Sequence, residues 1–283
     1  TSGIGDLRYE IQPAVPLASD EVLIKIDATG LNFSDVMKSL DLYPGLPDGP
    51  VMLGAECCGT IVCVGDEVAD WKLGDQVIAI AKGSFGTHAV VSKALIARKP
   101  RTLTADQAAT IPIAFWTADY AMNHCARLRA GESILIHSAS GGVGLAAIQL
   151  AKRIGLQIHA TAGSDEKRDY LRGLSIESIA DSRSLEFADE VRRQTEGEGV
   201  DAVLNSLPGE AIRKGLSLLK PGGRFLEIGK RDIYGDQTLD LSPFRNNLAF
   251  FAIDLDQLFT TAQAKMGTVL RQLSNRFETG ELQ

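Results

Sequence analysis

The stretch SILIHSASGGVG, residues 133–144, decides how the second half of this chain folds. An apolar run at 133–137 leads into a turn of small residues, and apolar side chains at helical spacing follow from Val143 to Ile154. A strand, a glycine turn and a helix in this order are the fingerprint of dinucleotide binding, because small residues let backbone amides approach a pyrophosphate at a helix N-terminus. The candidate phosphate contacts are Ala139, which stands in the first glycine's place, and Gly141, Gly142, Val143 and Gly144.

The alternation of strand and helix patterns continues after this turn. Apolar runs at 157–161, 200–207 and 223–229 are strand candidates, and a helical stretch at 210–219 separates the last two. An amphipathic stretch from Leu255 to Phe277 follows. Repeated strand and helix units predict a parallel sheet with helices on both faces. We therefore predict an α/β class, with a doubly wound Rossmann domain over residues 113–283.

The first part of the chain has a different pattern. Between glycine and proline residues, the apolar side chains alternate over 22–26, and 59–65 and 75–80 are further strand candidates. Residues 1–112 are therefore expected to form a separate, β-rich domain.

Charge and hydropathy exclude several classes of function. The 283 residues carry a net charge of −7, which disfavours a nucleic-acid partner. The apolar runs are far shorter than the roughly 20 residues of a membrane span. The four cysteines lack a CxxC pair, and the N-terminus resembles no secretory signal, so we expect a cytoplasmic protein with reduced thiols. The absence of an initiator Met suggests a domain excised from a longer chain.

The end of the second strand bears on the choice of dinucleotide. Residues 161–168 read TAGSDEKR, so no carboxylate stands directly at the strand end to hold the ribose of NAD. Ser164 and Lys167 could bind a 2′-phosphate through a hydroxyl and an ammonium group, which favours NADP(H). In the alternative interpretation, Ser164 only caps the following helix and Lys167 is solvated.

Seven motifs in order give a resemblance to a known family. They are LNFSDV (31–36), LYPG (42–45), GAE (54–56), GSFGTH (83–88), the glycine turn, LNSL (204–207) and FLEIGK (225–230). Together they resemble the enoyl reductase domain of polyketide synthases and fatty acid synthases, in the zinc-free, quinone oxidoreductase-like branch of the medium-chain dehydrogenase/reductase superfamily. The resemblance implies a GroES-like substrate domain over 1–112. It also implies that the segment returning to that domain is missing after Gln283.

The resemblance further implies an activity and its partners. The domain would use NADPH to reduce the 2,3 double bond of an enoyl thioester on an acyl carrier protein, beside other synthase domains. Lys230 and Asp254 match the family's proposed proton-donor pair, although they could form a structural ion pair. Tyr43 matches a position associated with the face at which a branched enolate is protonated, although packing in a turn would also explain it. Positions that line the nicotinamide end correspond to Asn32, Thr117, Asn205 and Gly229.

The family positions that hold zinc in other members argue against a metal. Asn32 and Ala55 stand where a thiolate and an imidazole would be needed, and only Glu56 is a plausible ligand. A stand-alone NADPH quinone or enone oxidoreductase remains an alternative function. A non-catalytic NADP-binding protein is an alternative of another class, and a homodimer remains open.

Overall fold

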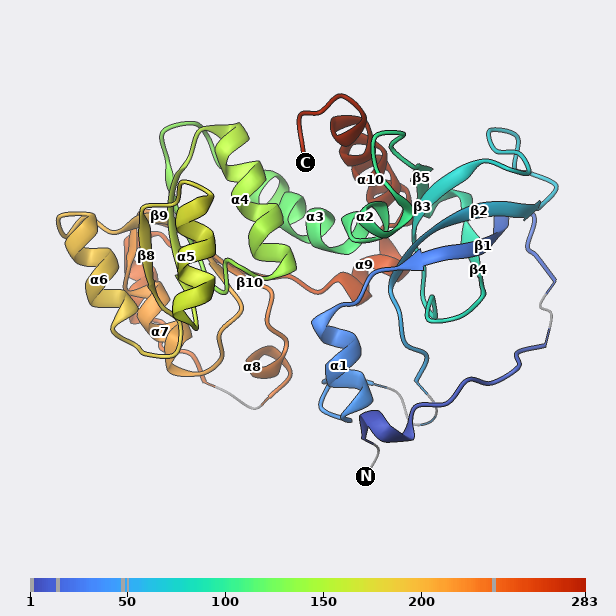
Figure 1. Ribbon diagram of the computed structural model, residues 1–283. Coiled ribbons are helices and arrows are strands. Elements are labelled where there is room, and N and C mark those ends of the chain that lie inside the picture. The colour runs from blue at the N-terminus through green and yellow to red at the C-terminus, as the bar shows by residue number, and fades with distance from the viewer. Residues whose placement is uncertain (1–2, 14–15, 47–48, 50, 236–237) are drawn as a thin grey trace. The chain divides into compact units, whose positions relative to one another are not determined.

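The computed structural model describes residues 3–13, 16–46, 49, 51–235 and 238–283, and the chain divides into two compact units (Figure 1). The first unit contains Thr1–Trp116 and Asp256–Gln283, and the second contains Thr117–Leu255. In the described part of the chain, no helix is both long enough and apolar enough to cross a membrane.

The first unit is built on an antiparallel sheet of five strands in the order β4-β1-β2-β3-β5. Along β1, Val22 and Ile24 are completely buried whereas Lys25 is exposed, as the alternating sequence predicts. Lys25 pairs with Thr60 of β2 on one side and with His88 of β4 on the other. The strands are β1 (Glu21–Thr29), β2 (Glu56–Val64), β3 (Gln76–Ile80), β4 (His88–Ser92) and β5 (Ile96–Arg98). The short helices of this part are η1 (Ile4–Asp6), α1 (Phe33–Ser39), η2 (Lys93–Leu95) and α2 (Ala105–Ala109).

The C-terminal stretch corrects the predicted domain boundary. It forms α9 (Leu255–Thr261) and α10 (Gln263–Glu278), and α10 packs against η2 and β5 of the first unit. Ser274 Oγ donates to the carbonyl of Arg98 at 2.5 Å, and the Trp116 indole donates to the carbonyl of Met266 at 3.0 Å. Residues 256–283 therefore do not belong to the second unit, to which the sequence pattern assigned them. They are themselves a segment that returns to the first unit.

The physical reason is that an amphipathic stripe shows only that one helix face is buried. The buried side chains of α10 are apolar at the predicted spacing, at Met266, Leu270, Leu273 and Phe277. They pack against other elements of the first unit, and the ring of Phe277 meets that of Phe115 edge to face, with ring centroids 4.8 Å apart. The sequence pattern contains no information on which sheet such a face covers.

The second unit is built on a parallel sheet of six strands in the order β11-β10-β9-β6-β7-β8. This is the order of a doubly wound Rossmann domain, so the predicted fold class is confirmed. The order reverses between β6 and β9, and such a switch point is where these sheets bind ligands at their carboxyl edge. The strands are β6 (Ser133–Ile136), β7 (Gln157–Ala162), β8 (Ser178–Asp181), β9 (Val200–Asn205), β10 (Leu219–Glu227) and β11 (Ala249–Ala252).

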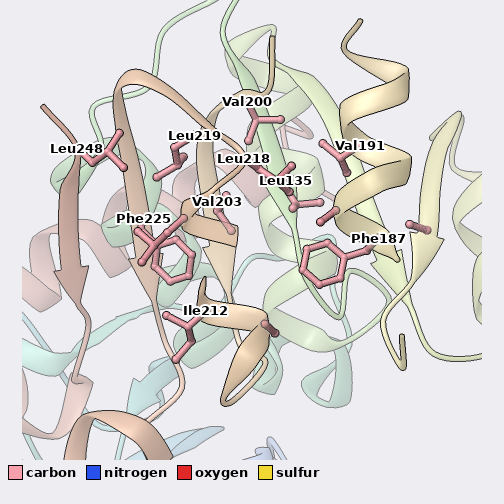
Figure 2. Packing of buried hydrophobic residues seen from close by; sticks show 14 residues of the cluster. Leu135, Phe187, Val191, Val200, Val203, Ile212, Leu218, Leu219, Phe225 and Leu248 are labelled. Carbon is pink, nitrogen blue, oxygen red and sulfur yellow. The ribbon is translucent and has the colours of Figure 1, made fainter. Parts of the chain in front are cut away.

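Helices and a continuous apolar cluster cover this sheet. All four residues of β6 are buried, as expected for a central parallel strand. Figure 2 shows the cluster between the sheet and two helices, with Phe187 of α6 near Leu135 and Ile212 of α7 near Phe225. The helices are α3 (Ile111–Asp119), which spans the unit boundary, η3 (Tyr120–Cys125), α4 (Gly142–Ile154), α5 (Asp165–Gly173), α6 (Phe187–Gln194), α7 (Glu210–Leu216), α8 (Arg231–Tyr234) and η4 (Ser242–Asn246).

Candidate active site

The glycine turn joins β6 to α4 at the switch point of the sheet. A Cβ atom on Gly144 would lie 2.6 Å from the backbone of Ala139, so the close packing of helix on turn requires glycine there. Ala139 and Gly144 are buried, whereas Gly141 and Gly142 are exposed and Val143 is half-buried. No side chain caps α4. The exposed amides at the start of α4 are therefore the groups that can bind a phosphate, while Ala139 and Gly144 shape the turn.

Two serines at this switch point were missed by the sequence analysis. Ser138, two residues after the end of β6, has a positive φ of 50°, in the left-handed region. Its hydroxyl lies 3.1 Å from that of Ser206, which directly follows β9. The signal in the sequence is a small polar residue after each of two neighbouring strands.

The end of β7 contains the candidate 2′-phosphate contacts. Ser164 Oγ accepts from the Lys167 N–H at 3.4 Å, so this serine does cap α5, as the alternative interpretation proposed. Lys167 is exposed. The neighbouring cation Arg168 is already engaged, because it binds Asp165 at 2.7 Å and lies 3.6 Å from Asp181.

Arg183 is a further cation at this corner that sequence reasoning missed. A Cβ atom on Gly163 would lie 3.1 Å from its Nε atom, so the guanidinium lies against the residue that follows β7. Arg183 is exposed; Asp181 Oδ1 accepts from its main-chain N–H at 2.8 Å, but among the described residues no acidic side chain forms an ion pair with its guanidinium group. The signal is its place just after β8, since neighbouring parallel strands end at the same edge of the sheet.

The structure brings Lys230 and Asp254 together. Nζ of Lys230, after β10, lies 2.5 Å from Oδ1 of Asp254, after β11, and the two side chains are only 14% and 16% exposed. Tyr234 was not predicted; its hydroxyl donates to Oδ2 of Asp254, and its ring centroid lies 5.7 Å from the ammonium group. The result is a partly buried cluster of a cation, a carboxylate and a phenol at the carboxyl edge of the sheet.

Asn205 and Gly229 meet at the buried carboxyl group of Glu227. Asn205 is completely buried, and its Nδ2 donates to Glu227 Oε2 at 2.5 Å. The Gly229 N–H donates to Oε1 at 2.6 Å. Burial raises the pKa of Glu227 to about 8; the two hydrogen bonds oppose this rise, and the charge of Asp232 adds to it. Thr117, the fourth residue predicted near the nicotinamide, is buried on α3.

Two predicted residues belong to the first unit. Asn32 Nδ2 donates to Glu56 Oε1 at 2.7 Å, and the Ile113 N–H donates to Oε2 at 2.7 Å. Burial raises the pKa of Glu56 to about 7 despite these two hydrogen bonds. Tyr43 donates to Asp256 Oδ2 at 2.8 Å, a partner 213 residues away that the sequence did not indicate. Among the described residues, no group of three or more His, Cys, Asp or Glu side chains is arranged to hold a metal ion.

Known proteins resemble both units. An alcohol dehydrogenase GroES-like domain matches residues 18–101, and a zinc-binding dehydrogenase domain matches residues 142–275. A phenolphthiocerol/phthiocerol polyketide synthase protein of Mycobacterium tuberculosis is 44% identical over 97% of this chain. CurK enoyl reductase is 36% identical, with a TM-score of 0.89, and the match covers 100% of this chain and 87% of that one. The chain belongs to the polyketide synthase enoyl reductases.

These enoyl reductases are oxidoreductases of the medium-chain dehydrogenase/reductase superfamily, so the predicted family is confirmed. This chain spans only 12% of the length of the Mycobacterium synthase protein that it matches. A mycobacterial protein solved in complex with NADPH is 26% identical, with a TM-score of 0.88, and the match covers 100% of this chain and 88% of that one.

Proposed function

We propose that this domain uses NADPH to reduce the 2,3 double bond of an enoyl thioester carried by an acyl carrier protein, within a polyketide synthase. The observation that carries the proposal is the Lys230–Asp254 pair, 2.5 Å apart at the carboxyl edge of the parallel sheet. The glycine turn before α4 opens at the same edge. A proton donor and a dinucleotide cradle at one edge of a sheet are what a reductase of this kind needs.

The residues at this edge fit NADPH. The backbone amides of exposed Gly142 and half-buried Val143, at the start of α4 where no side chain caps the helix, would bind the pyrophosphate. Lys167 and Arg183 would bind the 2′-phosphate, because both are exposed cations at the ends of neighbouring strands. Ser164 would add a hydroxyl donor there, since its role as a cap uses only an acceptor lone pair.

The chemistry divides between the cofactor and the chain. Reduction adds a hydride at Cβ and a proton at Cα, so one carbon–carbon π bond is replaced by two C–H bonds. When bound, NADPH supplies the hydride. The Lys230 ammonium group stabilises negative charge on the thioester oxygen and gives a proton from Nζ to Cα. Asp254 orients the ammonium group, and Tyr234 holds the second oxygen of that carboxylate.

We propose that Tyr43 selects the face at which a 2-methyl enolate is protonated. Its hydroxyl group is oriented by Asp256, which accepts from it at 2.8 Å, and the ammonium group of Lys38 lies 5.0 Å from its ring centroid. A phenol held between a carboxylate and a cation has a fixed direction. Such fixed direction is what a stereochemical role requires.

The proposal is tested by NADPH oxidation with crotonyl thioester, on acyl carrier protein or pantetheine, and in parallel with a quinone. The variant Lys230→Ala/Asp254→Ala should lose about 10²- to 10⁴-fold in turnover, the usual worth of proton-transfer catalysis. Its NADPH affinity should stay near that of the wild type. Lys220→Ala is the matched control, because Lys220 lies 3.4 Å from Asp201 at the opposite edge of the same sheet.

Each contrary result has a definite meaning. Full turnover of the double variant on the thioester would remove the pair from the mechanism. Oxidation with the quinone but not with the thioester would establish the quinone reductase alternative. NADPH binding without oxidation by either acceptor would identify a non-catalytic protein.

A further inference from the structure

Glu227 is a buried junction of three chain segments. It is the last residue of β10 and only 2% exposed. Its side chain accepts from Asn205 Nδ2 at 2.5 Å and from the Gly229 N–H at 2.6 Å. Its main-chain carbonyl accepts from the Ile253 N–H at 2.8 Å. One residue therefore connects the ends of β9, β10 and β11.

Two of these segments lead directly to the candidate proton-delivery pair. Gly229 immediately precedes Lys230, and Ile253 immediately precedes Asp254. The side chain of Glu227 thus fixes the backbone on the lysine side, and its carbonyl fixes the backbone on the aspartate side. Each of these hydrogen bonds is made by the residue directly before one member of the pair, whose side chains are 2.5 Å apart.

The junction has little freedom to rearrange. Asn205 Nδ2 also donates to the Leu207 carbonyl at 2.8 Å, and its Oδ1 accepts from the Leu207 N–H at 3.3 Å, so the carboxamide cannot turn without losing hydrogen bonds. A Cβ atom on Gly229 would lie 2.7 Å from Glu227 Oε1. The turn after β10 is therefore held tightly against the carboxyl group.

A carboxyl group is a costly choice for this position unless its two acceptors are needed. Burial raises the pKa of Glu227 to about 8, and no described cation forms an ion pair with it. An apolar side chain would leave two N–H donors, the buried one of Asn205 and the half-buried one of Gly229, without these acceptors. A glutamine would replace one of the two oxygen atoms by an NH2 group, which cannot accept a hydrogen bond, whereas both oxygens of a carboxyl group can.

We propose that Glu227 is a positioning residue for proton delivery, which fixes the backbone on both sides of the Lys230–Asp254 pair. The inference rests on the proposed function. Glu227 acts through its hydrogen bonds to the neighbouring turns and not by contact with the substrate. Its loss should therefore displace the proton donor while the fold and the pyrophosphate cradle stay in place.

The test compares Glu227→Gln with Glu132→Gln as the matched control. Glu132 accepts from Arg224 at 2.8 Å and from the Arg129 N–H at 2.7 Å, beside the start of β6 at the opposite edge of the sheet. Turnover on crotonyl thioester and NADPH affinity are measured for both variants. The rate of reductive methylation of Lys230 with formaldehyde and sodium cyanoborohydride, which reduces the iminium, is measured without cofactor or substrate, and the methylated residue is located by peptide mass spectrometry.

Glu227→Gln should lower turnover about tenfold or more. Proton-transfer catalysis typically contributes about 10²- to 10⁴-fold, and a displaced donor should lose part of it. NADPH affinity should change much less than turnover. Lys230 should be methylated several-fold faster, because its contact with Asp254 loosens. Glu132→Gln should change neither turnover nor methylation. Equal loss of turnover in the two variants, or unchanged methylation of Lys230 in Glu227→Gln, would overturn the proposal.

A second variant covers the case in which Glu227→Gln does not fold. Gly229→Ala leaves the carboxyl group in place, but its Cβ atom pushes the Gly229 backbone away from Glu227 Oε1. It should therefore also raise the rate of Lys230 methylation. An unchanged rate would count against the proposal. The methylation assay does not depend on turnover by the enzyme. A wild type that fails to reduce crotonyl thioester would therefore refute the proposed function, while the methylation rates still decide whether Glu227 holds the pair.

Discussion

The buried carboxyl group of Glu227 should make the stability of the second unit fall as the pH rises. Burial raises its pKa from 4.5 to about 8 in the folded protein. Below pH 4.5 the group is protonated in both states, and above this value only the unfolded chain releases the proton. The folded state then loses stability until the pH passes about 8, where Glu227 ionises in both states.

The size of the effect follows from the shift. Each pH unit between the two pKa values costs about 1.4 kcal/mol, so the loss between pH 5 and pH 8 is roughly 4 kcal/mol as an upper limit. The side chain at position 227 cannot ionise in Glu227→Gln. As the pH rises, the free energy of unfolding of this variant should therefore increase relative to that of the wild type by the same amount per pH unit. Any change in the free energy of unfolding that comes from replacing the carboxyl group by an amide is the same at every pH.

Urea unfolding from pH 5 to pH 8, followed by circular dichroism, measures this difference. Trp71 and Trp116 both lie in the first unit, so their fluorescence reports that unit separately. The fluorescence unfolding curves of the first unit should be the same for wild type and variant, because Glu56, a buried carboxyl group of this unit, is present in both. Parallel pH dependence of the second unit in the two proteins would show that Asn205 and Gly229 fully offset the burial of Glu227, and would refute the reasoning.

Three further results are expected. Lys167→Ala and Arg183→Ala should each weaken NADPH binding by about 1.5 to 3 kcal/mol and leave NADH binding almost unchanged, since each removes a charge-assisted hydrogen bond; titration showing equal losses for both cofactors would contradict the assignment. Gly142→Val should lower NADPH affinity in calorimetry more than it lowers the melting temperature. Gly144→Val should do the reverse, because its side chain would collide with the backbone of Ala139. Tyr43→Val should keep turnover but change the configuration of a 2-methyl product on chiral analysis, and an unchanged configuration would exclude the proposed role.

Features that depend on neighbours in the sequence could be predicted from it. The strand, glycine turn and helix over 133–154 follow from local spacing, and the structure contains β6 and α4 there. The pairing of Lys230 with Asp254 was also predictable, because both follow strands whose carboxyl ends share one edge. Their roles stay predictions.

Only the tertiary structure decided which distant segments meet. The apolar stripe of α10 covers the first unit, Tyr43 donates to Asp256, Arg183 lies against Gly163, and Glu227 joins three strand ends. Local periodicity gives the direction in which a side chain faces, but it does not identify what that face contacts. Burial and hydrogen bonding are set by segments far apart in the chain. For that reason the amino-acid sequence determined the fold class and the strand, glycine turn and helix over 133–154, whereas the domain boundary and the hydrogen bonds beside the Lys230–Asp254 pair required the folded chain.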